Sequence, residues 1–294
     1  MTAYYNENDP YAAQWLRNLI AAGHIALGEV DDRSIEDVCP DDLKGFTQCH
    51  FFAGIGGWSN ALRLAGWPDD RPVWTGSCPC QPFSVAGKQR GSEDERHLWP
   101  AWFWLIEQCR PPTIFGEQVT AAVAHGWLDL VLSDLEGAVY AVAAADLPAC
   151  CLGAPHRRQR LWWVADADSR RWLEQWSGRV FDGERAAFRH DADGRGEVRG
   201  MGNSDCARLE GWRDDAGKHA DEQPSRSSSP WCDIEWISCS DGKARPTQPG
   251  LFPLAHGVSS RVGRLRAYGN AIVPQVAAEF INAFMDCAMR PSPG

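Results

Sequence analysis

The sequence predicts an α/β fold built on a doubly wound, mostly parallel sheet. The first observation is that short apolar segments alternate with helix-like segments along the 294 residues. Residues 48–67 have the pattern of a strand, a glycine turn and a helix, residues 97–109 that of a helix, and residues 112–119 and 160–166 that of strands. The second observation is the turn FFAGIGG itself, which lies between a strand and a helix. Strands that alternate with helices favour parallel pairing, because each helix carries the chain back along the sheet.

Residues 9–23 predict a further helix near the N-terminus. Asp9 is a suitable N-cap, Pro10 fits the first turn, and Gly23 marks the end. The face that we expect to be buried carries Tyr11, Trp15, Leu19 and Ala22. Residues 71–81 predict a short strand that ends in a loop, and residues 277–289 predict a closing helix.

Composition limits the classes of function. The net charge of −10 argues against a protein that coats nucleic acid non-specifically, although a local basic cleft is compatible with it. The sequence has no apolar run of about 18 residues, and its N-terminus lacks the basic-then-apolar pattern of a secretion signal, so we expect a cytoplasmic protein. The 11 cysteines are irregularly spaced and are expected to be reduced thiols.

The segment GSCPCQPFSVAG, residues 76–87, places Cys78 and Cys80 on either side of a proline. Three interpretations are open: a metal site, buried packing residues, or a nucleophilic thiol. Zinc sites are commonly built from two paired cysteine clusters, and this pair has no convincing second cluster, so no metal site is predicted. A nucleophilic thiol needs an exposed loop that stabilises its thiolate, and the carboxyl end of a strand beside the glycine turn suits that role.

Five short motifs resemble the ordered signature motifs of DNA cytosine-5 methyltransferases. Each motif is weak alone, whereas the five in this order are specific. They are Phe52-Ala53-Gly54-Ile55-Gly56-Gly57, Pro79-Cys80-Gln81, Glu117-Gln118-Val119, Arg158-Gln159-Arg160 and Gly269-Asn270-Ala271. The resemblance implies a Rossmann-like methyltransferase fold, S-adenosyl-L-methionine as methyl donor and double-stranded DNA as substrate.

The resemblance also implies a role for each catalytic residue. Cys80 matches the thiolate that adds to carbon 6 of cytosine and makes carbon 5 nucleophilic, which requires the base to leave the DNA stack. Glu117 matches the carboxyl group that protonates or hydrogen-bonds N3 of the base, and this role requires some protonated form near neutral pH. Arg160 matches the guanidinium that holds the base carbonyl oxygen, and Arg158 matches its companion near the reacting base.

Further site residues follow from the same resemblance. Those expected to bind the donor are Glu7, Asn8, Ser34, Ile35, Phe52, Ala53, Gly54, Ile55, Gly56, Gly57, Leu98, Asn270 and Ala271. Those expected to contact the DNA substrate are Pro79, Gln81, Ser84 and Gly87.

The order of the segments predicts a circular permutation. The family normally has two more strands and a helix between the glycine motif and PCQ, whereas this chain has room there for one helix and one strand. The N-terminal NENDPYAAQWLRNLI resembles the missing ribose-binding part, in which Glu7 would accept the ribose hydroxyls and Asn8 replaces an aromatic residue. In SIEDVCPDDLKGF, Ser34 stands where an acidic residue is expected, and Ile35 would stack on the adenine or offer its backbone N–H.

The permutation keeps the spatial order of the family, in which the first five strands lie as 3-2-1-4-5. We therefore expect residues 9–22 to pack beside the helix at 58–65, and Glu7 to lie near Gly54. The alternative is an unrelated helical extension before a truncated donor site.

Three departures from the family pattern keep other functions open. Gln118 replaces the usual asparagine, which braces the nucleophile loop, and His50 stands where an acidic residue often precedes the glycine motif. The insert that begins near Asp166 is short for a target-recognition domain. The leading interpretation is an active methyltransferase; the alternatives are a catalytically inactive DNA-binding relative and a thiol- or zinc-dependent nucleic-acid protein.

Composition divides the chain into three parts. Residues 168–230 are rich in Arg, Asp, Gly and Ser, which favours an exposed and partly flexible insert. We expect a catalytic domain over residues 1–167, a small target-recognition insert over 168–250, and a C-terminal segment over 251–290 that returns to the catalytic domain. We further expect a bacterial or phage-encoded monomer with a possible restriction endonuclease partner.

Overall fold

The computed structural model describes residues 2–79, 98–120, 126–154, 156–168, 235–238, 244–247 and 269–289. The predicted site residues Cys80, Gln81, Ser84 and Gly87 and most of the predicted insert lie outside these described residues. The chain divides into two compact units. The first comprises Met1–Pro148, Arg158–Trp172 and Phe252–Gly294, and the second Ala149–Arg157 and Leu173–Leu251.

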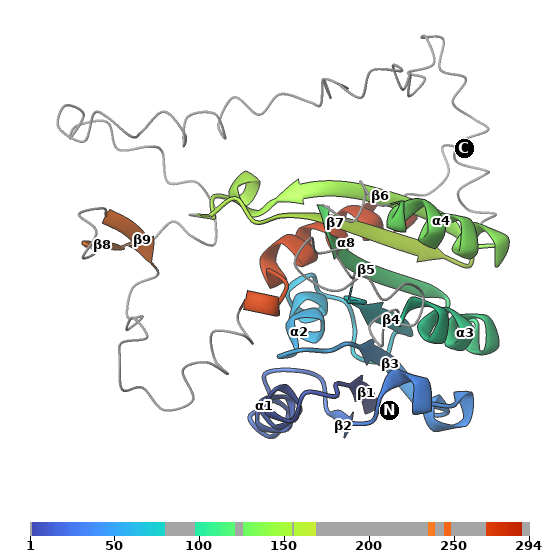
Figure 1. Ribbon diagram of the computed structural model, residues 1–294. Coiled ribbons are helices and arrows are strands. Elements are labelled where there is room, and N and C mark those ends of the chain that lie inside the picture. The colour runs from blue at the N-terminus through green and yellow to red at the C-terminus, as the bar shows by residue number, and fades with distance from the viewer. Residues whose placement is uncertain are drawn as a thin grey trace, which may run out of the picture. The chain divides into compact units, whose positions relative to one another are not determined.

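The first unit is built on a seven-stranded sheet in the order β2-β1-β3-β4-β5-β7-β6 (Figure 1). The strands are β1 (Thr2–Asn6), β2 (Gly28–Asp31), β3 (Phe46–Phe51), β4 (Val73–Gly76), β5 (Thr113–Val119), β6 (Ala141–Pro148) and β7 (Gln159–Asp166). The first five strands in this order are parallel, and β7 is antiparallel to both β5 and β6. The prediction of a mostly parallel α/β sheet is confirmed, and the order β2-β1-β3-β4-β5 is the expected 3-2-1-4-5 arrangement.

Helices cover both faces of this sheet (Figure 1). On one face lie α1 (Pro10–Ala21), α2 (Gly57–Leu64) and α8 (Pro274–Met289), and on the other lie α3 (Trp99–Cys109) and α4 (Trp127–Gly137). Two short 3₁₀ helices, η1 (Ile35–Asp37) and η2 (Pro40–Leu43), follow β2 and precede β3 in the sequence. Both pack against α3. Among the described residues, no helix is long and apolar enough to cross a membrane.

The N-terminal helix α1 begins where its capping residue predicts. The Asp9 carboxylate accepts hydrogen bonds from the backbone N–H groups of Tyr11 and Ala12, at 2.9 and 3.1 Å. As expected, α1 lies beside α2: an added Cβ on Gly56 would be 3.3 Å from Leu16 Cδ2, and the Arg63 guanidinium donates to the carbonyl of Gly23 at 2.8 Å.

The predicted buried face of α1 is wrong by about one residue position. The buried side chains are Ala12, Ala13 and Leu16, whereas Trp15 is only half-buried and Ala22 is exposed. Small alanines let the helix approach the sheet closely, and this leaves the larger rings at the margin of the contact, where Trp15 packs on Tyr11 at a ring distance of 6.1 Å.

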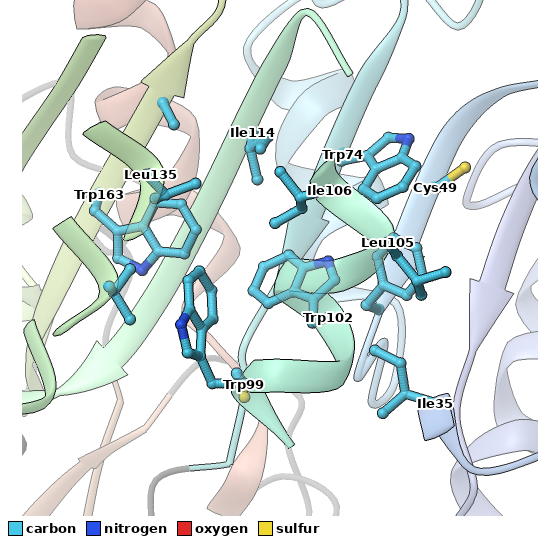
Figure 2. Packing of buried hydrophobic residues seen from close by; sticks show 14 of the residues in the cluster. Ile35, Cys49, Trp74, Trp99, Trp102, Leu105, Ile106, Ile114, Leu135 and Trp163 are labelled. Atoms are coloured by element: carbon cyan, nitrogen blue, oxygen red, sulfur yellow. The ribbon is translucent and has the colours of Figure 1, made fainter. Parts of the chain in front are cut away.

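The core on the α3 and α4 face is rich in indole rings, which pack among aliphatic side chains (Figure 2). Trp99 packs edge-on against Trp102 and Trp163, with ring centroids 5.6 and 6.1 Å apart. Gly116 of β5 lies directly opposite Trp163 of β7, and an added Cβ on Gly116 would lie 2.0 Å from the indole. Gly76 of β4 meets Trp102 in the same way at 2.5 Å. The two glycines therefore supply the space that the rings occupy.

The second unit contributes two described pieces. One is the 3₁₀ helix η4 (Ala149–Leu152), and the other is an antiparallel hairpin of β8 (Glu235–Ser238) and β9 (Ala244–Thr247). The predicted recognition role of this region stays a prediction.

We predict that Gly116→Ala destabilises the fold. The new methyl group would overlap the Trp163 ring, and overpacking of a close-packed core costs about 1–3 kcal/mol. Urea unfolding should show this loss of free energy of unfolding. Gly137→Ala is the matched control, because nothing lies within 4 Å of an added Cβ at that helical position. Equal stability of both variants and the wild type would contradict the packing account.

Candidate active site

The candidate site lies at the edge of the sheet where β1, β3, β4 and β5 end, because parallel strands point their carboxyl ends the same way. The glycine turn follows β3 and leads into α2. Its backbone is left-handed at Phe52, Gly54 and Gly56, with φ of 50, 55 and 80°. An added Cβ at Gly54 would have nothing within 4 Å, so the turn presents open backbone at a helix N-terminus.

The N-terminal strand joins this turn directly. The Gly54 N–H donates to Glu7 Oε2 at 2.7 Å, and the Ala53 N–H donates to the carbonyl of Asn6 at 3.0 Å. The second Glu7 oxygen accepts from the Asp9 N–H at 2.9 Å. The expected proximity of Glu7 to Gly54 is therefore confirmed. A carboxylate oxygen can accept more than one hydrogen bond.

The neighbouring loop differs in detail from the expectation. The Asn6 amide donates to the carbonyl of Arg33 at 2.9 Å and so ties this loop to the end of β1. The Ser34 side chain caps η1, where its hydroxyl accepts from the Glu36 N–H. Ile35 is 3% exposed and belongs to the indole-rich core, as Figure 2 shows. Stacking of Ile35 on an adenine is thus wrong as an expectation, because its side chain is already covered, and only the backbone N–H alternative stays a prediction.

Three other residues predicted to bind the donor lie before α3, in the glycine turn and after β1. Leu98 precedes the first residue of α3 and packs partly buried against the indole cluster. The Phe52 ring packs edge-on against Trp102 at 5.9 Å. Asn8 is exposed at the end of β1. The roles of Leu98, Phe52 and Asn8 in binding a donor stay predictions.

The structure brings Glu117 and Arg160 together in a buried ion pair. Arg160 Nε lies 2.9 Å from Glu117 Oε1, and the two side chains are 21% and 9% exposed. Because β7 runs antiparallel to β5, the start of β7 lies beside the end of β5, with Arg160 opposite Val119. Burial raises the pKa of Glu117, and the charge of Arg160 opposes that rise. The net direction of the change in the Glu117 pKa is upward, which favours the neutral carboxyl form relative to an exposed glutamate.

Sequence reasoning missed Ser77, which completes this polar group. Its hydroxyl hydrogen-bonds the Glu117 carboxylate and accepts from Trp58 Nε1 at 3.1 Å. Both Ser77 and Glu117 lie at the carboxyl ends of adjacent parallel strands. That shared position was the sequence signal that would have identified Ser77.

Gln118 reaches the segment that leads to Cys80. Its side-chain N–H donates to the carbonyl of Cys78 at 2.8 Å, and its oxygen accepts from the Val119 N–H at 2.8 Å. Cys78 itself is 2% exposed and packs in the core. The extra methylene of Gln118 therefore does not prevent a contact with this loop, and Cys78 is a packing residue.

Arg158 immediately precedes β7 and has an unusual backbone φ of 30°. Its guanidinium donates to the carbonyl of Gly269 at 2.9 Å and to that of Ala271. Burial and the neighbouring Arg160 lower its pKa, while Glu117 opposes this. The predicted role of Arg158 beside the base stays a prediction.

His50 does not supply the charge of the acidic residue it replaces. The ring is 1% exposed, stacks on Tyr5 at 4.8 Å and shares a 2.7 Å hydrogen bond between Nδ1 and Thr75 Oγ1. Burial lowers the pKa of His50 to about 3, so the ring is neutral near pH 7.

Comparison with known proteins gives a family match for part of the chain. Residues 68–181 match the family model for C-5 cytosine-specific DNA methylase. This part of the chain is therefore similar to that family. Over 113 residues it is 33% identical to the Type II methyltransferase M.AplI of Arthrospira platensis, which covers 38% of this chain and 32% of that protein. Over 99 residues it is 29% identical to M.HhaI of Haemophilus parahaemolyticus, which covers 32% of this chain and 30% of that protein.

The chain thus matches these two relatives over about a third of their length. Among solved structures, a DNMT2 mutant of Spodoptera frugiperda aligns with a TM-score of 0.40 and 17% identity, over 56% of this chain and 42% of that one. Dnmt2 of S. pombe aligns with a TM-score of 0.35 and 16% identity, over 67% and 58%. The fold class rests on the strand order and directions described above.

We predict that Gln118→Asn, which restores the residue usual in the family that the sequence resembles, lowers the rate of the methyl transfer that this resemblance implies. The shorter side chain cannot reach Cys78 from this backbone position, so the loop that carries Cys80 loses a support, and misplacement of a reacting group costs about tenfold or more in rate. Gln48→Asn is the matched control, because Gln48 is also buried and hydrogen-bonds the carbonyl of Pro68 away from the site. Equal rates for the two variants would contradict this role of Gln118.

We predict that His50→Gln flattens the dependence of stability on pH. The pKa of His50 is lowered in the folded chain, so between pH 6.5 and pH 3 the unfolded chain binds a proton that the folded chain excludes. The contribution of His50 to the free energy of unfolding is therefore fully present above pH 6.5 and is lost as the pH falls toward 3. The free energy of unfolding should therefore fall less steeply in the variant, by about 1.4 kcal/mol per pH unit. Urea unfolding between pH 7 and pH 4 measures this slope, and an unchanged slope would contradict a neutral buried ring.

Proposed function

We propose that the protein transfers a methyl group from S-adenosyl-L-methionine to carbon 5 of cytosine in double-stranded DNA. The observation that carries the proposal is the buried Glu117–Arg160 pair, which lies at the same sheet edge as the glycine turn and beside the strand that leads to Cys80. The pKa of the Glu117 carboxyl is raised, and the Arg160 guanidinium lies beside it. Such a pair suits a cytosine ring that gains negative charge during the reaction, because both groups can donate hydrogen bonds to that charge.

The residues at the glycine turn fit the donor. The turn presents open backbone at Gly54, and Glu7 holds two carboxylate oxygens next to it, as a ribose diol requires. The donor supplies an electrophilic methyl group when bound. In this proposal Glu7 accepts the ribose hydroxyls, and Phe52, the backbone of residues 53–57, Leu98, Asn270 and Ala271 border the remainder.

The chain's own groups carry the chemistry on the base. The Cys80 thiolate forms a bond to carbon 6 of a flipped-out cytosine, and the electron pair of the ring double bond moves toward N3. Glu117 hydrogen-bonds or protonates N3, and Arg160 holds the base carbonyl oxygen, so that the developing charge is stabilised. Carbon 5 then takes the methyl group, its proton leaves, and the Cys80–carbon 6 bond breaks to restore the thiolate.

The proposal includes a permuted order of segments. Support comes from the order β2-β1-β3-β4-β5, in which the first strand of the chain lies between β2 and β3. The family match begins at residue 68, between α2 and β4, which is where the expected order of segments changes. In this proposal residues 1–167 and 251–290 form the catalytic domain and residues 168–250 the recognition insert. A companion restriction endonuclease is part of the same proposal, since the relatives named above are Type II methyltransferases.

The thiol is tested by trapping with DNA that contains 5-fluorocytosine, in which fluorine blocks loss of the carbon 5 substituent. We predict a covalent adduct with the wild type in the presence of the donor and none with Cys80→Ser. Cys78→Ser is the matched control, because that thiol is buried in the core, and it should still form the adduct. Absence of any adduct with a folded wild type would favour the inactive DNA-binding relative.

We predict that Glu7→Ala weakens binding of S-adenosylhomocysteine, the demethylated donor, by about tenfold to a hundredfold. The change removes the acceptor for two hydroxyls and for the Gly54 N–H, and a lost hydrogen bond to a charged group costs about 1.5–3 kcal/mol. Calorimetry measures the dissociation constant. Glu29→Ala on β2 is the control, since that carboxylate is exposed, and equal affinity of both variants would remove Glu7 from the donor site.

A further inference from the structure

The guanidinium of Arg158 hydrogen-bonds the backbone on both sides of Asn270, in the C-terminal segment. It donates to the carbonyl of Gly269 at 2.9 Å and to the carbonyl of Ala271, and these carbonyls flank Asn270. The two partners are 111 and 113 residues away in sequence, and all of them belong to the first compact unit. A charged donor on two peptide carbonyls is a strong, directional clamp.

The local backbone indicates that these contacts determine the Arg158 conformation. Its φ of 30° is in the left-handed region, which a residue with a side chain occupies at a cost that its surroundings must offset. Arg158 Nε is buried and finds no hydrogen-bond partner within the described part of the chain. Both features fit a side chain held by its terminal nitrogen.

The clamped segment abuts the glycine turn. Ile272 follows directly after Ala271 and is 8% exposed, and an added Cβ on Gly57 would lie 2.7 Å from its Cγ1. Gly57 is the first residue of α2, immediately after the turn. Movement of residues 269–272 would therefore open the packing on that side of the turn.

We propose that Arg158 is a positioning residue that fixes residues 269–272 against the glycine turn, and so sets donor affinity, rather than a residue that contacts the base. This inference rests on the proposed function for the identity of the donor. Arg158 precedes the strand that carries Arg160, so the clamp also ties the donor side of the site to the Glu117–Arg160 pair. The clamp acts through peptide carbonyls and is independent of the side chain at Asn270.

The test compares Arg158→Ala with Arg157→Ala, which removes the same charge from the adjacent, exposed arginine. Hydrogen exchange of the full chain without ligand should show faster exchange of the 270–273 amides in Arg158→Ala only. The dissociation constant of S-adenosylhomocysteine should rise about tenfold, or about 1.4 kcal/mol. The KM for S-adenosylmethionine should rise with it, and by a larger factor than kcat at saturating donor falls.

Two results would overturn the clamp. One is unchanged exchange at residues 270–273 in Arg158→Ala. The other is unchanged donor affinity with a large loss of kcat, which is the signature of a base contact. Failure of the proposed function gives a different pattern: the wild type would not bind S-adenosylhomocysteine, while the exchange difference between the two variants would persist. Arg158→Lys is the conservative variant and should recover part of the protection, since its ammonium group retains donors for one carbonyl.

Discussion

The pairing of β1 with β3 is the constraint on which the site depends. Two backbone N–H groups of the glycine turn, those of Ala53 and Gly54, bind the carbonyl of Asn6 and the carboxylate of Glu7. Without this pairing, the N-terminal segment and the glycine turn would be separate pieces of chain. With it, the left-handed backbone after β3 and the carboxylate after β1 face each other at one edge of the sheet. The loop that follows β2 is then attached through the Asn6 amide to Arg33.

The antiparallel direction of β7 brings further polar residues to the same edge of the sheet. A parallel strand next to β5 would have presented its end there, whereas antiparallel β7 presents its beginning, so Arg158 and Arg160 arrive beside the end of β5. Arg160 then meets Glu117 in a buried environment, where an unpaired charge would be strongly unfavourable. The polar groups of the site are thus supplied by strand ends from both directions, on a sheet whose centre is apolar.

The predictable parts of the structure are those set by local chemistry. Asp9 predicts the start of α1 because its carboxylate can cap only an adjacent helix end, and the residues around FFAGIGG predict a strand, a turn and a helix in that order. The strand order could be inferred because the motif order fixed which segments must be neighbours. By contrast, β6 and α4 were not predicted: β6 is a mostly half-exposed AVAAADLP with little apolar alternation. Ile35 and Gln118 differed from expectation because their surroundings come from distant segments, the indole core and the carbonyl of Cys78.

The fit of Gly116 to Trp163 also bears on how this sequence can change over generations. A larger residue at position 116 would overlap the ring of Trp163, and a smaller residue at position 163 would leave a void beside Gly116. Either substitution alone is therefore destabilising while the other residue of the pair is retained. The two positions are non-additive and their substitutions are expected to be mutually conditional. Gly76 and Trp102 form a second pair of the same kind. Drift in this core should therefore proceed by paired replacements, and related sequences should show glycine and tryptophan appearing or disappearing together at these two pairs of sites.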